Sequence, residues 1–246
     1  MSEALVIIPT YNEIENISNI IDAVTGLPEE FDILVIDDNS PDGTADVVKR
    51  KMEEHPGSVH LEQRSGKLGL GTAYIHGFKW ALEHGYDYII EMDADFSHSP
   101  DDLPKLLRAC RDEGADVAVG SRYISGVNVV NWPMGRVLMS YYASAYVRLV
   151  TRMKVRDTTA GFVCWTRRVL ETINLDTIEF KGYAFQIEMK YKAMRLGFRI
   201  KEVPIVFVNR VLGTSKMSGS IFGEAVFGVI KLKFSSIFNK NFGRRL

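Results

Sequence analysis

An α/β domain built on a mostly parallel sheet is the fold that the sequence predicts for this chain of 246 residues. In the first half of the chain, short apolar runs rich in Val, Ile and Leu alternate with amphipathic helical patterns. Parallel strands need crossover connections, which helices supply, so this alternation favours a Rossmann-like central sheet flanked by helices on both faces. The chain length suits one large domain or a domain with an appendage.

The elements follow from these patterns in chain order. Strands are expected at residues 4–9 (ALVIIP), 31–37 (FDILVID), 59–63 (VHLEQ), 86–93 (YDYIIEMD) and 115–120 (ADVAVG). Helices are expected between them at 14–24, 44–54, 71–83 and 101–111. Beyond residue 120 the alternation weakens, and the sequence predicts a helix at 134–150, a strand at 160–165, a helix at 183–196 and an extended segment at 200–208.

The last part of the chain has a composition of its own. Residues 221–238 are apolar with interspersed lysines, and residues 231–246 hold five basic and no acidic side chains. This composition is typical of an amphipathic helix in an anionic bilayer surface, although a helix packed on the domain or a docking face for a membrane subunit has the same pattern. We therefore expect a domain at 1–220 and a membrane-interfacial C-terminal extension at 221–246.

Charge divides the chain into two unlike halves. Residues 1–116 hold 24 acidic and 9 basic side chains, whereas residues 117–246 hold 7 acidic and 21 basic ones. A separation of this size indicates that one half holds a cation while the other faces anions such as phosphates. The basic residues are mixed with apolar ones and form no recognised module, so no nucleic-acid partner is expected.

Neither a disulfide nor a membrane span is expected. Cys110 and Cys164 lie in apolar surroundings, which is typical of buried free thiols. No targeting signal is recognised, and no run of about 18 uncharged apolar residues occurs. We expect a cytoplasmic protein, bound peripherally at the cytoplasmic face of a membrane.

Three polar segments follow three of the expected strands. They are Tyr11–Glu13, Asp37–Asp38 and Asp93–Asp95. Ligands of doubly wound sheets bind at the carboxyl ends of the strands, so these segments should converge on one crevice. No G-x-G-x-x-G turn follows the first strand, and GKLGLG at 66–71 is interpreted as a turn and helix start, with proximity to a nucleotide as the alternative.

The pair Asp93 and Asp95 indicates a metal site. Residues two apart in a strand point the same way, so both carboxylates are expected to project into the crevice from the strand end. Two carboxylates this close repel unless a cation lies between them, and Mg²⁺ or Mn²⁺ prefers such ligands together with phosphate oxygens. A solvated loop with acidic helix-capping residues is the alternative.

The ordered series of motifs resembles family 2 glycosyltransferases of the GT-A fold. The series is VIIPTYNE, VIDDNSPDGT, GLGTAYIHGF and EMDADFSHSP. The later motifs GSRY, DTTAGF, GYAFQIEM and EVPIVFVNRVLGTSKM resemble dolichol- or polyprenol-phosphate mannose synthases, in the form of the catalytic subunit without transmembrane helices. The resemblance covers roughly residues 4–235. It implies transfer of mannose from GDP-mannose to dolichyl or polyprenyl phosphate with inversion.

The resemblance also assigns roles to individual residues. It implies that the metal and the GDP diphosphate bind at Asp93, Ala94 and Asp95. It implies guanosine contacts from the PTYNE segment, through Pro9, Tyr11 and Glu13, and from the DDNS segment, where Asp38 is favoured over Asp37. Related enzymes often place a metal-binding Gln where this chain has Ser97, whose hydroxyl is a shorter and weaker ligand. The motif arginines and lysine are Arg122, Arg210 and Lys216.

The acceptor side calls for positive charge and for no general base. A phosphate monoester carries about −1.5 to −2 charge at neutral pH and is already a nucleophile. Candidates to hold it are Arg122, Arg136, Arg210 and Lys216, with Lys181 less favoured, because guanidinium groups bind phosphate bidentately. His98 is expected to pack at the helix start or behind the metal, with an acid/base role as the less favoured alternative. Gln186 and Glu188 face either the sugar hydroxyls or only the ordinary polar side of a helix.

Two other functions remain open at this point. One is a glucosyl- or aminosugar transferase that uses a UDP-sugar with the same class of acceptor, and the other is a non-catalytic nucleotide-binding scaffold. The helix at 134–150, with its tyrosines, is either a second membrane contact or part of the core. A membrane-embedded partner subunit is a further expected partner.

Overall fold

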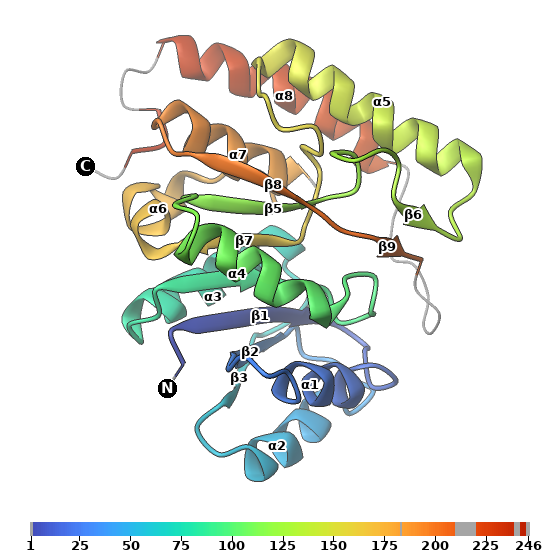
Figure 1. Ribbon diagram of the computed structural model, residues 1–246, viewed down its shortest axis with the longest axis vertical. Coiled ribbons are helices and arrows are strands. Elements are labelled where there is room, and N and C mark those ends of the chain that lie inside the picture. Colours follow the sequence, from blue (N-terminus) through green and yellow to red (C-terminus); the bar gives the residue numbers. More distant parts are fainter. Residues whose placement is uncertain (1, 183, 210–219, 239–241, 245–246) are drawn as a thin grey trace.

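A seven-stranded sheet forms the centre of the protein (Figure 1). The structure is a computed structural model that describes residues 2–182, 184–209, 220–238 and 242–244, with the backbone alone for 220–227. The sheet has the strand order β3-β2-β1-β4-β7-β5-β8. Its strands are β1 Ala4–Thr10, β2 Asp32–Asp37, β3 Val59–Gln63, β4 Tyr88–Glu91, β5 Val117–Ser121, β7 Val163–Thr166 and β8 Ile200–Pro204.

The predicted mostly parallel sheet is confirmed. Every strand pairing is parallel except those of β7, which lies antiparallel between β4 and β5. The sequence predicted a strand near β7 but neither its direction nor its place. A second, two-stranded sheet pairs β6 Val129–Val130 with β9 Phe207–Val208.

Helices cover both faces of the large sheet, as predicted. On one face lie α1 Ile17–Thr25, α2 Thr44–Glu54 and α4 Leu103–Arg111, which is preceded by the short helix η1 Pro100–Asp102. On the other face lie α3 Leu70–Glu83, α6 Arg167–Thr172 and α7 Ala184–Arg195, with η2 Leu175–Thr177 between the last two. Alternation along β1 serves both layers, because Val6 and Ile8 join the first core whereas Leu5 and Ile7 join the second.

The start of α3 shows why the GKLGLG segment is rich in glycine. Gly69 has a φ of 107°, a left-handed conformation that favours glycine, and it is the N-cap of the helix. A Cβ at Gly71 would lie 2.8 Å from the ring of Phe185 on α7. The interpretation of this segment as a turn and helix start is therefore confirmed.

Two long helices form a further layer over α7. They are α5 Met134–Thr151 and α8 Ser220–Phe238, which contact each other at the top of Figure 1. Val229 and Leu232 of α8 share a buried cluster with Val147 of α5 and Tyr191 of α7. Beyond α8, Phe242 joins the same cluster. In the described part of the chain, no helix is long and apolar enough to cross a membrane.

The two cysteines are free thiols, as expected. Both are buried, and the Cys110 thiol lies 3.8 Å from the carbonyl oxygen of Cys164.

Candidate active site

The three predicted polar segments meet at one edge of the sheet. β2, β1 and β4 are parallel neighbours, so their carboxyl ends at Asp37, Thr10 and Glu91 lie side by side. In Figure 1 this edge is on the right of the molecule, where β6 and β9 also lie. The expected convergence on one edge is therefore confirmed by the strand order.

Asp37 joins the ends of the first two strands. It is fully buried, and its Oδ1 accepts hydrogen bonds from Thr10 Oγ1 at 2.9 Å and from Ser40 Oγ at 2.6 Å. Its Oδ2 accepts one from the backbone N–H of Ser40 at 2.9 Å. Both oxygens are thus engaged in the loop after β2.

Asp38 is held by an arginine that sequence reasoning missed. Arg64 donates from Nε to Asp38 Oδ1 at 2.6 Å, and its Nη2 lies 2.5 Å from the same oxygen. Burial raises the pKa of Asp38 above its ordinary value, although the Arg64 guanidinium opposes this shift. Arg64 also donates to Thr72 Oγ1 at 2.8 Å and so ties the end of β2 to the start of α3.

The PTYNE segment leaves β1 beside this pair. Pro9, half-buried near the end of β1, lies opposite Ile36 in the parallel register. The ring of Tyr11 lies 5.0 Å from Lys67 Nζ, a cation–π contact between the first and third crossover loops. The buried Glu13 accepts a hydrogen bond from Asn16 Nδ2 at 2.9 Å, and its backbone N–H donates to Thr44 Oγ1 at 3.1 Å.

The acidic loop, the segment after β4 that holds Asp93 and Asp95, differs from its prediction in one respect. The fourth strand ends at Glu91, so Asp93 and Asp95 lie in the turn that follows and not at the strand end. The Asp93 side chain is 40% exposed, whereas Asp95 is 7% exposed, so strand alternation does not orient the pair. Asp95 Oδ1 accepts a hydrogen bond from the backbone N–H of Ser97 at 3.0 Å, and Phe96 between them has a left-handed φ of 58°. The expectation of a shared strand face was therefore wrong.

His98 holds the acidic loop from behind. Its Nδ1 accepts a hydrogen bond from the backbone N–H of Asp93 at 3.2 Å, and its ring stacks on Phe162 at 4.8 Å. Burial lowers the pKa of His98 to about 4, so the imidazole is neutral at pH 7. With Nδ1 accepting, the ring proton lies on Nε2. These contacts fit the expected packing role.

The donor atoms of the acidic loop fit a hard divalent cation. Mg²⁺ and Mn²⁺ need one or two protein carboxylates and take further oxygens from phosphates and water, and Asp93 and Asp95 offer such a set. Ser97 is buried and lies in the same turn. Counting His, Cys, Asp and Glu alone among the residues that the structure describes, a cluster of three lies elsewhere, at Asp22, Glu54 and His55. Lys51 already lies 2.8 Å from Asp22 and 2.6 Å from Glu54.

Arg122 forms a buried ion pair with Asp157. Nε and Nη2 of Arg122 donate to the two carboxylate oxygens of Asp157 at 2.7 and 2.6 Å, and Nη2 also donates to Thr159 Oγ1 at 2.9 Å. Burial alone would raise the pKa of Asp157, but the adjacent guanidinium holds this pKa below its ordinary value. A bidentate grip on phosphate through these two donors would have to displace Asp157.

Arg136 extends from the first turn of α5 into the same region. Its guanidinium lies 4.2 Å from the ring centre of Trp132, and Nη1 donates to Asn209 Oδ1 at 3.0 Å. Arg210 and Lys216, the other two expected phosphate-binding residues, lie outside the residues that the structure describes. Lys181 is exposed, and its carbonyl oxygen accepts a hydrogen bond from the backbone N–H of Gly71 at 2.8 Å.

Gln186 belongs to a buried polar network under the carboxyl edge. It donates from Nε2 to Glu91 Oε2, while Trp165 Nε1 donates to Glu91 Oε1 at 2.5 Å. Lys190 donates to the carbonyl oxygen of Ala160 at 2.6 Å and to Gln186 Oε1 at 3.2 Å. Burial raises the pKa of Glu91 to about 7 and lowers that of Lys190 to about 8. The network fixes α7 against the loop that carries Asp157.

Glu188 faces away from the sheet edge. Its Oε2 accepts hydrogen bonds from the backbone N–H groups of Glu179 and Phe180 at 3.0 and 3.1 Å, and its Oε1 lies 2.8 Å from Lys192 Nζ. Gln186 and Glu188 are both almost fully buried in these internal contacts. Neither of the two alternatives for them, sugar recognition or an ordinary polar helix face, describes this arrangement.

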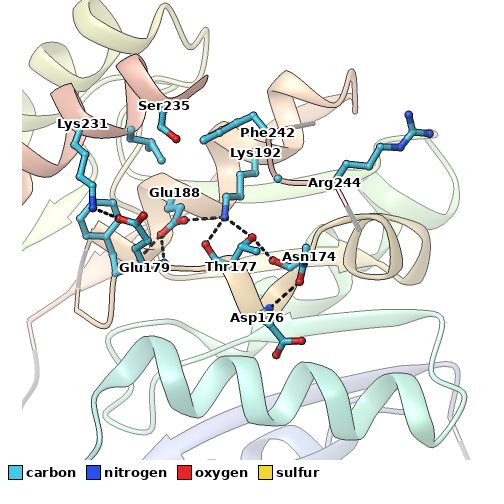
Figure 2. A pocket seen from close by; sticks show the side chains of 13 residues that line it. Asn174, Asp176, Thr177, Glu179, Glu188, Lys192, Lys231, Ser235, Phe242 and Arg244 are labelled. Atoms are coloured by element: carbon cyan, nitrogen blue, oxygen red, sulfur yellow. Dashed lines mark hydrogen bonds and ion pairs between the residues drawn. The ribbon is translucent and has the colours of Figure 1, made fainter. Parts of the chain in front are cut away.

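A cavity of about 590 Å³ adjoins Glu188 and Lys192, between η2, α7 and α8 (Figure 2). The two lysines that line it are already engaged, because Lys231 lies 2.5 Å from Glu179 and Lys192 donates to the carbonyl oxygen of Thr177 at 2.9 Å. None of the expected donor-site residues lines it. This cavity is thus separate from the candidate active site.

Comparison with known proteins identifies the family. Residues 5–173 match the model of Glycosyl transferase family 2. The chain belongs to glycosyl transferase family 2. The match includes the acidic loop and the loops after β1 and β2, so the resemblance inferred from the motifs is confirmed.

Two curated relatives of this glycosyltransferase align over nearly its whole length. An undecaprenyl-phosphate mannosyltransferase from Micrococcus luteus is 50% identical over 227 residues, which cover 92% of each chain. A polyprenol monophosphomannose synthase from Mycolicibacterium smegmatis is 48% identical over 225 residues, which cover 92% of this chain and 84% of that protein.

The solved structures that resemble the glycosyltransferase share its fold. One is glucosyl-3-phosphoglycerate synthase from Mycobacterium tuberculosis in complex with Mn²⁺, UDP and phosphoglyceric acid, with a TM-score of 0.68 and 18% identity over 96% of this chain and 78% of that chain. A complex of the same enzyme with Mn²⁺, UDP and glucosyl-3-phosphoglycerate gives a TM-score of 0.66. These likenesses confirm the expected GT-A fold.

Three residues of the glycosyltransferase were not anticipated as parts of the site. Asp157 stands in the DTTAGF motif but has no role without its partner Arg122, which is 35 residues away in the chain. Arg64 and Trp132 lie outside every motif that was quoted. The function of a lone arginine or tryptophan in a loop cannot be predicted from one sequence, because it depends on which side chains the fold brings into contact with it.

Proposed function

We propose that this glycosyltransferase transfers mannose from GDP-mannose to a polyprenyl or dolichyl phosphate with inversion at the anomeric carbon. The acceptor class is supported by two relatives near 50% identity whose names specify undecaprenyl phosphate and polyprenol monophosphomannose. The donor nucleotide is inferred from the motif resemblance. The products are polyprenyl phosphate mannose and GDP.

One structural observation supports this reaction above the others. The small sheet of β6 and β9 connects the acidic loop to the arginines, because the backbone N–H of Val208 donates to the carbonyl oxygen of Ser97 at 3.3 Å and Asn209 binds Arg136. Phe207 of the same strand contacts the ring of His98, with 5.4 Å between ring centres. This contact between the acidic loop and the arginines supports the proposal of a diphosphate leaving group next to an anionic acceptor.

On the donor side, Tyr11, Glu13 and Asp38 would contact the guanosine, with Pro9 shaping the same wall. Asp93, Ala94 and Asp95 would face the diphosphate, and Ser97 is the third candidate ligand of the cation. A divalent cation, Mg²⁺ or Mn²⁺, bound there neutralises the charge that develops on the β-phosphate as the glycosidic bond breaks.

On the acceptor side, no general base is required. An oxygen of the ionised acceptor phosphate forms a bond to the anomeric carbon while the bond from that carbon to the β-phosphate oxygen breaks, and the electron pair of the breaking bond leaves with GDP. His98, the histidine beside the acidic loop, uses Nδ1 to hold the Asp93 backbone. Its neutral ring suits a positioning role.

The acceptor phosphate would be held by Arg122, Arg136, Arg210 and Lys216. Among them Arg136 contacts an aromatic ring and an amide oxygen, two neutral groups that help to orient its guanidinium. Arg122 would contribute mainly through its remaining guanidinium nitrogen, since Asp157 engages Nε and Nη2 and offsets the positive charge.

A membrane surface would present the lipid acceptor. Apolar side chains are exposed on the two helices of the outer layer, namely Met134, Leu138, Met139, Tyr141, Tyr142 and Leu149 on α5 and Ile230, Phe234, Ile237 and Phe238 on α8. Lys231 and Lys233 are interspersed with the α8 group, a combination suited to an anionic bilayer. We place the enzyme peripherally at the cytoplasmic face of a membrane, where a membrane-embedded partner subunit could cover the same surface.

A donor screen tests the proposal directly. The purified chain is incubated with farnesyl phosphate, Mg²⁺ or Mn²⁺, and GDP-mannose, UDP-glucose or UDP-N-acetylglucosamine in separate reactions, and the lipid product is identified by mass spectrometry. We expect a hexose to be added to the lipid phosphate from GDP-mannose and not from the UDP-sugars. Transfer from a UDP-sugar alone would overturn the donor, and metal-dependent GDP binding without any transfer would point to a scaffold.

A further inference from the structure

Trp132 lies where the two arginines of the acceptor side come together. It follows β6 and precedes α5, and its ring centre is 4.2 Å from the Arg136 guanidinium and 5.5 Å from that of Arg122. Its ring also meets Phe207 of β9 edge-on, with 5.2 Å between ring centres. One indole thus contacts both cations and the strand that leads back to the acidic loop.

The contacts of the ring, and not its polar atom, hold Trp132 in place. Its indole N–H is buried and has no hydrogen-bond partner among the described residues. A hydrogen bond to another described residue is therefore not what selects this orientation. The ring is held by Phe207 and by the two guanidinium groups.

An aromatic ring and a carboxylate affect a neighbouring guanidinium in different ways. Asp157 binds Arg122 through both oxygens and offsets its positive charge. A ring offers only the negative face of its quadrupole, which attracts the cation without cancelling its charge for a second anion.

We propose that Trp132 is a positioning residue that orients Arg136 toward the acceptor phosphate. The inference rests on the proposed function, since it assigns Trp132 to the acceptor half of that site. Trp132 acts through Arg136 and does not itself take part in bond formation. Its loss therefore weakens the use of the lipid phosphate and leaves nucleotide binding unchanged.

Two substitutions at Trp132 separate the contribution of its aromatic face from that of its N–H group. Trp132→Phe keeps an aromatic face and deletes the N–H, whereas Trp132→Leu deletes the face. We expect Trp132→Leu to raise the KM for farnesyl phosphate about 3- to 30-fold, the range of a partly buried cation–π contact, and Trp132→Phe to retain most of the wild-type value. The KM for GDP-mannose and the affinity for GDP stay at wild-type values in both variants.

A double substitution tests the route of the effect. In an Arg136→Met background, Trp132→Leu should cause little further rise in the KM for farnesyl phosphate, because the group it orients is gone. An equal fold-change in both backgrounds, or a parallel rise in the KM for GDP-mannose, would overturn the inference. Trp80→Leu on α3 controls for the loss of an indole elsewhere in the chain.

Direct binding distinguishes this inference from the proposed function. Farnesyl phosphate is titrated calorimetrically into wild type and variants without nucleotide, and thermal unfolding reports whether each variant is folded. Wild type that neither binds nor uses farnesyl phosphate would overturn the proposed function itself. Wild type that does both, with a folded Trp132→Leu variant that binds equally well, would overturn only the role of Trp132.

Discussion

Arg122 and Asp157 form a two-point ion pair in the interior of the protein, with N–O distances of 2.7 and 2.6 Å. The backbone N–H of Arg122 also donates to Asp157 Oδ2 at 3.0 Å, so the pair fixes main chain and side chain together. Glu202 of β8 steadies the same loop, because its Oε1 accepts a hydrogen bond from the Asp157 backbone N–H at 3.0 Å. The proposed acceptor side of the site would therefore be built around an internal salt bridge.

Replacing Asp157 by Asn should destabilise the protein. The change leaves the Arg122 guanidinium buried without a counter-charge, and breaking such a pair costs about 3–5 kcal/mol. Urea unfolding at pH 7 measures the loss. Asp46→Asn on the surface of α2 is the matched control, because Asp46 is 71% exposed and should change the free energy of unfolding little.

The ion pair of Arg122 and Asp157 also predicts how the free energy of unfolding depends on pH. The pKa of Asp157 in the folded protein lies below its ordinary value of 3.8, so its contribution is fully present above that value and is lost as the pH falls through the folded-state pKa. The difference in unfolding free energy between wild type and Asp157→Asn should therefore shrink in strong acid. A difference that stays constant down to about pH 2 would contradict the assignment.

Replacing Asp95 by Asn should abolish metal-dependent turnover while the fold persists. The amide oxygen of Asn can still accept the hydrogen bond from Ser97, which keeps the turn, but it lacks the charge that holds a divalent cation. We expect activity to fall about 100-fold or more, because the cation supplies several kcal/mol of charge stabilisation. The assay compares wild type and variant with Mn²⁺ and with EDTA, and full wild-type activity in EDTA would refute the metal role.

Replacing Arg64 by Gln should weaken guanosine nucleotide binding. Without the guanidinium, Asp38 loses its partner at 2.6 Å and no longer presents a fixed carboxylate beside Tyr11. A charge-assisted hydrogen bond contributes about 1.5–3 kcal/mol, so we expect the Kd for GDP to rise about tenfold or more. Calorimetry measures this change, and the exposed pair Lys49 and Asp46 offers Lys49→Gln as a control. Equal GDP affinity in Arg64→Gln and wild type would exclude a nucleotide-site role for the pair.

Replacing Phe234 and Phe238 by Ser should reduce binding to anionic vesicles. These rings are 58% and 83% exposed on α8, so the substitutions remove little from the interior of the protein. Transfer of each ring into the bilayer surface contributes about 1.5–3 kcal/mol, and co-sedimentation should fall at least tenfold. Ile14→Ser, in the loop between β1 and α1, is the control for loss of an exposed apolar side chain. Unchanged sedimentation would reject α8 as the membrane contact.

The first half of the fold was accessible from the sequence because each strand and helix there has a strong local pattern. α2 and β3 have the predicted bounds, and the parallel order of β2, β1 and β4 brings the predicted acidic and aromatic residues to one edge. The second half was harder. β7 lies antiparallel between β4 and β5. Its position and direction in the sheet depend on its neighbours in the fold and not on the composition of the strand.

The roles of single side chains depended on tertiary contacts. Gln186 was assigned either to the sugar site or to an ordinary helix face, and it instead donates to Glu91, which is 95 residues away in the chain. Asp93 and Asp95 were expected to share a strand face, but hydrogen bonds from Ser97 to Asp95 and from Asp93 to His98 shape a turn there. Local periodicity predicts the direction in which a side chain points only while the chain remains in a regular helix or strand.

By itself, the sequence determined the class of fold, the edge of the sheet at which the site lies and the family of the enzyme. Those properties follow from local periodicity and from the order of short motifs. Both can be recognised without knowledge of contacts between distant parts of the chain. Only the tertiary structure decided that Arg122 is paired with Asp157, that Arg64 holds Asp38 and that Trp132 contacts two arginines. The charge that a side chain can offer to a ligand depends on the neighbours the fold assigns to it, and these neighbours come from remote parts of the chain.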